Sequence, residues 1–123
     1  MSILDKIKLT KIREVNGLNR SQLEHDRQNF LKSPQIGHRF VSSLSDSKDK
    51  PYTLITEIKK ASPSKGIIRE DFNPRELALS YERGGASCLS ILTDVNYFKG
   101  SNEYITQIKE VVSIPILRKD FMI

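Results

Sequence analysis

The spacing of apolar residues changes partway along the chain. In the first part, apolar side chains recur about every three or four positions, which is typical of helices. A Ser-x-x-Glu pattern formed by Ser21 and Glu24 predicts that a second helix opens there. The polar stretch 42–51 predicts a connector. We therefore expect a helical extension with its connector over residues 1–50, and a domain of another kind over residues 51–123.

The second part alternates two patterns. Short apolar runs rich in β-branched residues predict strands, and periodic stretches between them predict helices. In chain order these are strand 52–60, helix 72–85, strand 88–94, helix 101–113 and strand 114–121. A single helix between successive strands implies that the strands are parallel and that the crossovers are right-handed. The pattern predicts an α/β domain that opens as strand, helix, strand, helix, strand.

The helix over 72–85 has the clearest boundaries. Asn73 is a good N-cap residue, and Pro74 suits the first helical position, where no backbone N–H is needed. Gly84 or Gly85 supplies the left-handed residue that commonly ends a helix.

Composition narrows the class of protein. The chain has 123 residues, of which 37% are hydrophobic and 28% charged, which suits a soluble globular protein. It has no apolar run of the roughly 18 residues that a membrane span needs, so we expect no membrane association. Cys88 is the only cysteine, which excludes an intrachain disulfide and favours the cytoplasm. We interpret Cys88 as a core residue, since no catalytic partner lies near it in sequence.

The net charge of +5 raises the question of partners. The basic residues are interleaved with 15 acids and form no cluster, so nucleic-acid binding is disfavoured. A small anionic substrate suits the same charge. His25 and His38 are not spaced as a metal-binding pair, and we expect no metal.

Charged residues follow the apolar parts of two predicted strands. Because side chains alternate along a strand, Glu57 and Lys59 share one face, and Lys119 occupies the matching end of the last strand. Ligands of α/β folds bind at the carboxyl ends of the strands. If both faces point inward, a carboxylate and two ammonium groups converge, and a lysine there can act as a general acid. The competing interpretation is a solvated ion pair at the rim, with the Ser-Pro-Ser-Lys-Gly stretch forming an ordinary turn.

Four stretches resemble the indole-3-glycerol phosphate synthase family: "LITEIKKASPSKGIIREDFNP", "YERGGASCLSILTD", "YFKGS" and "IPILRKDF". "SILDKI" near the start is similar to the extra N-terminal helix of that family. The resemblance implies a (β/α)₈ barrel with an N-terminal helical extension. It also implies closure of the indole ring of 1-(2-carboxyphenylamino)-1-deoxyribulose 5-phosphate, with loss of carbon dioxide and water and without a cofactor.

The resemblance also implies roles for individual residues. Lys119 matches the general acid that protonates the ketone oxygen of the substrate. Lys59 matches a lysine that contacts its anionic groups, and Glu57 matches a glutamate that orients the two lysines. Three further positions match substrate-binding residues. Ser62 matches a serine near the anthranilate carboxylate, and Phe98 and Phe121 match aromatic residues that pack around the anthranilate ring.

The length of the chain limits this assignment. A (β/α)₈ barrel takes about 250 residues, so we expect the chain to hold only the first three strands and two helices of the barrel. The dehydration base and most of the phosphate site would lie in the missing C-terminal half, so we expect the piece alone to be inactive. One alternative is a non-catalytic half-barrel that acts only by assembly with that half. Another is phosphoribosylanthranilate isomerase, but its Cys/Asp pair fits poorly because Cys88 begins a strand.

Overall fold

The computed structural model describes residues 1–33, 39–45 and 49–123. The chain divides into two compact units, Met1–Gly37 with Phe121–Ile123, and His38–Asp120. The first is helical, and the second contains the sheet. The functional division of the chain into 1–50 and 51–123 stays a prediction, and His38 lies outside the described residues.

The N-terminal unit begins with α1 (Ile3–Asn16). Ser2 and Asp5 form a capping box, in which the Asp5 N–H donates to Ser2 Oγ and the Ser2 N–H donates to Asp5 Oδ2. Each bond satisfies a backbone donor that the helix itself leaves unpaired. Ile7 and Lys11 are the buried residues of α1.

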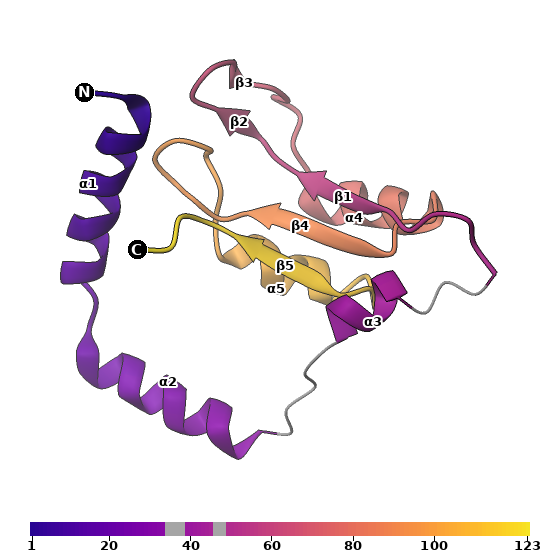
Figure 1. Ribbon diagram of the computed structural model, residues 1–123, viewed down its shortest axis with the longest axis horizontal. Helices are drawn as coiled ribbons and strands as arrows, with labels where there is room; N and C mark the ends of the chain where they lie inside the picture. The colour runs from indigo at the N-terminus through magenta and orange to yellow at the C-terminus, as the bar shows by residue number, and fades with distance from the viewer. Residues whose placement is uncertain (34–38, 46–48) are drawn as a thin grey trace. The chain divides into compact units, whose positions relative to one another are not determined.

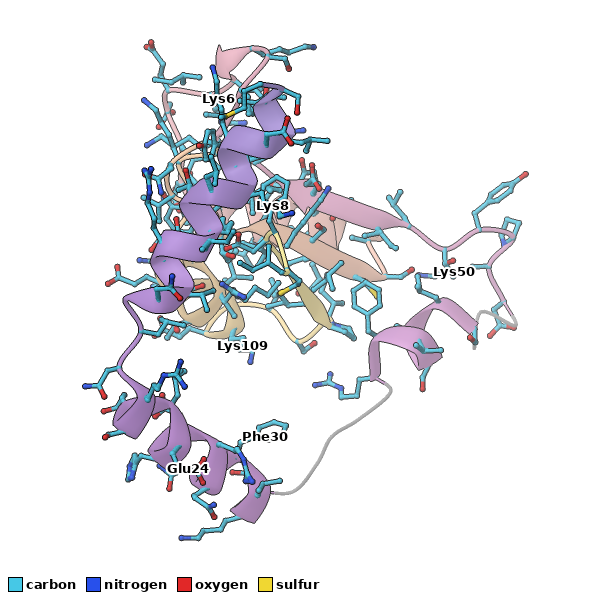
Figure 2. All side chains as sticks on the ribbon, turned by 60° about the vertical axis from the view of Figure 1, so that its left-hand side comes forward. Lys6, Lys8, Glu24, Phe30, Lys50 and Lys109 are labelled. Carbon is cyan, nitrogen blue, oxygen red and sulfur yellow. The ribbon has the colours of Figure 1, made fainter. Side chains whose placement is uncertain are left out.

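The second helix, α2 (Arg20–Lys32), begins earlier than the sequence pattern predicts. The side-chain oxygen of Asn19 accepts a hydrogen bond of 3.1 Å from the N–H of Gln22. The predicted capping box at Ser21 and Glu24 was therefore wrong, because Asn19 caps the helix first and Ser21 lies in its first turn. All residues of α2 are described, and none of them is buried. Figure 2 labels Glu24 among the side chains of this helix.

The second unit is built on a sheet of three parallel strands in the order β1-β4-β5, which confirms the predicted parallel arrangement (Figure 1). The strands are β1 (Ile55–Ile58), β4 (Cys88–Leu92) and β5 (Ile116–Lys119). The central strand β4 is buried along its whole length, whereas β5 is mostly exposed. In the described chain, β1 and β5 each have a neighbour on one side only.

Helices α4 (Pro74–Arg83) and α5 (Glu103–Lys109) cover one face of this sheet (Figure 1). Apolar side chains from both helices meet apolar side chains of β1 and β4 to form the core. The buried members are Ile58, Ala78, Leu89, Ile91, Ile108 and Val112. Tyr104 and Ile105 of α5, with Val111 just after it, pack against the same cluster.

The boundaries of α4 confirm the sequence signals. The N–H of Glu76 donates to Asn73 Oδ1 at 3.2 Å, and Pro74 is the first helical residue. Of the two candidate terminators, Gly84 keeps a right-handed conformation with φ −75°, and Gly85 is left-handed with φ +96°. A left-handed residue at this place favours glycine, which has no Cβ to clash.

Residues 42–45 correct the sequence prediction of a polar connector over 42–51. They belong to a short helix, α3 (Arg39–Ser45), which packs against β4. The buried thiol of Cys88 lies 3.7 Å from the carbonyl oxygen of Phe40 in this helix. The core role of Cys88 is thus confirmed. Residues 46–48 of the connector lie outside the described residues.

A small hairpin follows β1 and projects beyond it (Figure 1). Its strands, β2 (Ala61–Ser62) and β3 (Gly66–Ile67), are antiparallel. Gly66 has φ +63°, a left-handed conformation that glycine adopts without strain. The hairpin therefore gives the Ser-Pro-Ser-Lys-Gly stretch a regular backbone at the carboxyl end of β1.

Candidate active site

The carboxylate of Glu57 lies between two lysines. Lys119 Nζ donates to Glu57 Oε2 at 2.7 Å, and Lys59 Nζ lies 3.3 Å from Glu57 Oε1. Strand β1 carries Glu57, Lys59 follows that strand directly, and Lys119 ends β5. The structure thus brings together the three side chains whose convergence the strand alternation predicted.

The sheet register explains how Glu57 reaches Lys119. Glu57 stands opposite Ser90 of β4, and Lys119 stands opposite Leu92 of the same strand. Neighbouring strands are about 4.8 Å apart, so β1 and β5 are separated by nearly 10 Å. The Glu57–Lys119 pair therefore passes over the central strand on the face opposite α4 and α5. The length of the lysine side chain makes this span possible.

The environment of Glu57 keeps its carboxylate ionised. Partial burial alone would raise the pKa of Glu57, but the hydrogen bonds and charges of Lys119 and Lys59 outweigh it and lower the pKa below its ordinary value of 4.5. The side chain is 29% exposed, whereas the side chain of Lys119 is 52% exposed. At neutral pH this group is therefore an anion that holds two cations, with the Lys119 ammonium open to a ligand.

Ser90 joins this group, although no sequence pattern predicted it. Its hydroxyl donates to Glu57 Oε2 at 3.3 Å, the same oxygen that accepts from Lys119. Ser90 is only 5% exposed. The available signal was a single hydroxyl inside an apolar strand, which does not identify its partner 33 positions earlier.

Thr93 and Asp120 fix the backbone around Lys119. The Thr93 N–H donates to the Lys119 carbonyl at 3.0 Å, which extends the ladder between β4 and β5 by one bond. The Thr93 hydroxyl donates to Asp120 Oδ2 at 2.9 Å, and Arg118 forms an ion pair with the same oxygen at 3.2 Å. These contacts hold the strand end that carries Lys119.

Phe98 lies on the loop after β4, at the same edge of the sheet as Lys119. Asp94 organises this loop, because its Oδ2 accepts from the N–H groups of Tyr97 at 2.7 Å and Phe98 at 3.1 Å. The Gly100 N–H then donates to the Asp94 carbonyl at 2.7 Å and closes the loop. Phe98 is half-buried. Asp94 is thus a second residue of this region that no sequence pattern predicted.

Ser62 and Phe121 are the other two residues predicted to bind the substrate. The Ser62 hydroxyl accepts a bond of 3.3 Å from the N–H of Lys65, within the hairpin after β1. Phe121 is the first of the three C-terminal residues that group with the N-terminal unit. The substrate-binding roles of Ser62, Phe98 and Phe121 stay predictions.

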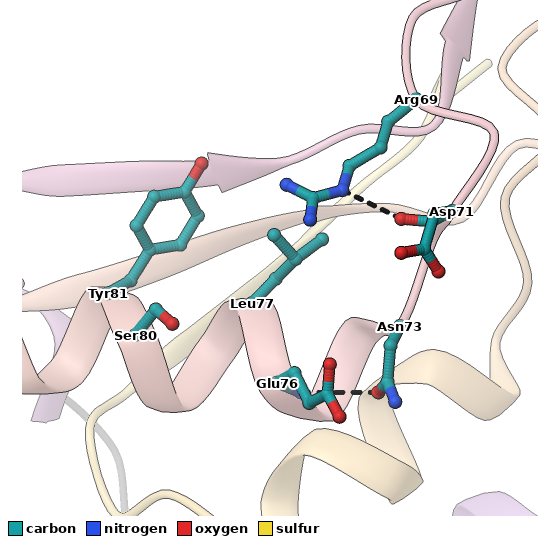
Figure 3. A pocket seen from close by; sticks show the side chains of 7 residues that line it. All are labelled: Arg69, Asp71, Asn73, Glu76, Leu77, Ser80 and Tyr81. Atoms are coloured by element: carbon teal, nitrogen blue, oxygen red, sulfur yellow. Dashed lines mark hydrogen bonds between the residues drawn. The ribbon is translucent and has the colours of Figure 1, made fainter.

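Two hollows lie beside α4, and one of them is also lined by β1. One has a volume of about 440 Å³ and is lined by Glu57, Ile58, Lys59, Ile68, Arg69, Leu77 and Tyr81. The other has about 330 Å³, and in Figure 3 the Arg69 side chain extends over Leu77, with its Nε donating to the Asp71 carbonyl at 2.7 Å. Lys119 lines neither of them.

Comparison with known proteins decides the family. The family model described as indole-3-glycerol phosphate synthase matches residues 4–123. The chain belongs to the indole-3-glycerol phosphate synthase family. An "Indole-3-glycerol phosphate synthase" of Aliarcobacter butzleri (strain RM4018) is 46% identical over 121 residues, which is 98% of this chain and 45% of that relative. The resemblance found in the sequence is confirmed, and the chain spans less than half the length of this relative.

The family has the TIM-barrel fold, and the parallel α/β sheet of the second unit is consistent with it. Among residues 1–33, 39–45 and 49–123, no helix is long and apolar enough to cross a membrane. The same part of the chain holds no group of three or more His, Cys, Asp or Glu side chains that could bind a metal ion.

Proposed function

We propose that the protein containing these residues converts 1-(2-carboxyphenylamino)-1-deoxyribulose 5-phosphate to indole-3-glycerol phosphate, with loss of carbon dioxide and water. The observation that supports this most directly is the Lys119–Glu57–Lys59 cluster at the carboxyl edge of a parallel sheet, in a chain of the synthase family. Two ammonium groups and one carboxylate leave the cluster with a net positive charge, which attracts and orients a substrate that carries a carboxylate and a phosphate.

In this proposal Lys119 is the general acid. Its ammonium group donates a proton to the ketone oxygen of the substrate, which makes the carbonyl carbon electrophilic toward the ring carbon that bears the carboxylate. Glu57 holds the ammonium at 2.7 Å without taking its proton, because the lowered pKa of Glu57 makes this carboxylate a weak base. Lys59 binds an anionic group of the substrate from the other side of Glu57.

In this proposal, positioning of the substrate contributes the remaining part of the rate acceleration. Ring closure joins two ends of a flexible molecule, and such reactions accelerate strongly when the reacting atoms are held together. Phe98 and Phe121 are proposed to pack around the anthranilate ring, and Ser62 is proposed to bind the anthranilate carboxylate. All three come after the carboxyl end of a sheet strand in the sequence: Ser62 after β1, Phe98 after β4 and Phe121 after β5.

The architecture proposed for the chain is the first part of a (β/α)₈ barrel, preceded by the helical extension 1–50. The three parallel strands with two covering helices fit the start of such a barrel. The chain matches 45% of the length of its relative, so the remainder would supply the dehydration base and the phosphate site. We propose that residues 1–123 alone have negligible synthase activity.

The test is a fusion of residues 1–123 to the remaining part of the A. butzleri relative. The fusion is expected to form indole-3-glycerol phosphate, detected by indole absorbance, whereas residues 1–123 alone form none. Lys119→Met in the fusion should lower kcat by roughly 10²–10⁴-fold, the usual contribution of a general acid. Lys109→Met, at an exposed position in the last turn of α5, is the matched control and should leave kcat unchanged.

Two outcomes would contradict the proposal. A folded fusion that binds but does not convert the substrate would count against the function. An active fusion in which Lys119→Met matches the parent would count against the role of Lys119.

A second candidate is a non-catalytic half that acts only by assembly. The free sides of β1 and β5 in the described chain support it, because unpaired strand edges recruit further strands. Mixing residues 1–123 with the separately produced remainder of the relative distinguishes the two. Activity in the mixture favours a split enzyme, and a stable but inactive complex favours assembly alone.

A further inference from the structure

We infer that Ser90 is a positioning residue that directs Glu57 toward Lys119 rather than toward Lys59. The inference rests on the proposed function, because it assigns Ser90 a part in presenting the acid lysine to the substrate. Two properties of Ser90 carry it, the small size of the side chain and its hydroxyl group.

The size of Ser90 leaves room for the ion pair. Ser90 stands in register with Glu57 on one side and Leu117 on the other, in the middle of the three-stranded sheet. The Glu57–Lys119 contact must pass over this position, because β4 lies between the strands that carry the two residues. A branched apolar side chain at position 90 would occupy the path. Side chains of that kind are typical of buried parallel strands, so serine is the unusual choice.

The hydroxyl of Ser90 selects the lysine. Glu57 has a lysine at each carboxylate oxygen, Lys119 at 2.7 Å from Oε2 and Lys59 at 3.3 Å from Oε1. Ser90 donates to Oε2 only, at 3.3 Å. This bond holds Oε2 close to the central strand β4, on the side from which Lys119 approaches. Without the bond, the carboxylate can rotate toward Lys59, which lies only two residues further along the chain.

Burial strengthens this effect. Ser90 is 5% exposed, so water competes little for its hydroxyl, and a hydrogen bond to an ionised acceptor is stronger than one between neutral groups. The bond also costs little side-chain freedom, because serine has a single rotatable side-chain bond before its oxygen. Ser90 is therefore a hydrogen-bond donor with little side-chain freedom, next to the more flexible carboxylate of Glu57.

The first experiment needs no enzyme activity. NMR titration of the Glu57 carboxyl carbon in residues 1–123 is compared between the parent, Ser90→Ala and Ser90→Thr. Ser90→Ala keeps the space and removes the donor, so the pKa of Glu57 should rise relative to the parent, and the exchange protection of the Lys119 ammonium should fall. Ser90→Thr keeps the donor but adds a methyl group in the path of the ion pair, so its Glu57 titration should lie between those of Ser90→Ala and the parent.

Ser87→Ala is the matched control. It makes the same chemical change three positions earlier, where the hydroxyl accepts from the Leu54 N–H at 3.2 Å and does not touch Glu57. It should lower stability without moving the Glu57 titration. This separates positioning from a general loss of structure.

The second experiment uses the fusion with the remainder of the A. butzleri relative. Ser90→Ala should lower kcat about tenfold, the loss expected from one hydrogen bond to a charged group, with KM changed by less than about threefold. Ser90→Val should lower kcat further, because it also fills the path of the ion pair. Ser90→Thr has the same branched shape but keeps the hydroxyl, so it should lose less kcat than Ser90→Val.

The outcomes separate the two proposals. A Glu57 titration that is unchanged in Ser90→Ala overturns the inference, even if the fusion is active. A shifted titration together with a fall in kcat supports it. A shifted titration in a fusion whose parent is inactive supports the positioning of Glu57 and counts against the proposed function.

Discussion

Gly100 is the position where a single added carbon atom should do the most damage to the loop that carries Phe98. The loop folds back on β4 at this point, and the Gly100 N–H donates to the Asp94 carbonyl at 2.7 Å. A Cβ at position 100 would lie 2.4 Å from the Leu92 carbonyl oxygen and 2.8 Å from the carbonyl carbons of Leu92 and Thr93. These atoms belong to the backbone of the central strand, so they cannot rotate away. We predict that Gly100→Ala destabilises the protein.

The magnitude follows from the shift that alanine requires. Ordinary van der Waals contact begins at 3.4 Å, so the loop must move by about 1 Å to accept the Cβ. Such a move takes the 2.7 Å bond between Gly100 and Asp94 beyond hydrogen-bonding distance. Overpacking costs about 1–3 kcal/mol, and the lost bond costs about 1 kcal/mol more. We therefore expect a loss of about 2–4 kcal/mol in the free energy of unfolding, or roughly 10 °C in Tm.

The assay is urea unfolding followed by circular dichroism, at a protein concentration where light scattering reports no association. Gly84→Ala is the control, because Gly84 has φ −75° and its Cβ would lie 3.5 Å from the Tyr81 carbonyl oxygen and, at its closest contact, 3.3 Å from the Ser80 carbonyl oxygen. The Ser80 carbonyl belongs to the residue four positions earlier, a neighbour that every helical residue has. The control should be neutral or stabilising by up to about 1 kcal/mol. If Gly100→Ala unfolds within about 0.5 kcal/mol of the parent, the close approach argued for this loop is wrong.

Three further predictions test the sheet. Because the pKa of Glu57 is lowered in the folded protein, its charge contributes stability that is fully present above the ordinary pKa of 4.5 and is lost as the pH falls through the folded pKa. The free energies of unfolding of the parent and Glu57→Gln should therefore converge in acid. A difference between them that does not change with pH would contradict this. Burial raises the pKa of the Cys88 thiol, so Ellman's reagent should react with it only after urea is added, and rapid reaction in buffer would show that it is accessible. Ile55 and Leu117 are each 47% exposed, so light scattering should detect association that Leu117→Lys reduces; a monodisperse parent would contradict this.

Alternation along the strands predicted much of the candidate site. A period of two is set by backbone geometry, so the shared face of Glu57 and Lys59 follows from the sequence as soon as the strand is recognised. The parallel order then places Lys119 at the same edge. Ser90 could not be predicted in the same way, because its contact with Glu57 depends on the register between β1 and β4, which no local pattern specifies.

Local signals predicted helix ends unevenly for a similar reason. Asn73 was an unambiguous cap, because Pro74 follows it and allows only one starting point. Near the second helix, both Asn19 and Ser21 could accept the capping bond, and the sequence pattern does not rank them. The helix over 39–45 was missed because its short apolar repeat lies among serines, and its stability comes from packing against β4.

The arrangement of charges makes Glu57 the central member of the cluster. Each lysine contacts the carboxylate, so removing Lys59 leaves the pair of Glu57 with Lys119, and removing Lys119 leaves the pair of Glu57 with Lys59. Removing the charge of Glu57 instead leaves two ammonium groups on one sheet face with no acid from the cluster between them. Like charges repel, so without the carboxylate the two lysine side chains should move apart. Glu57→Gln should therefore disturb the site more than the loss of Lys59 does. The single glutamate of β1 thus holds both lysines together on one face of the sheet.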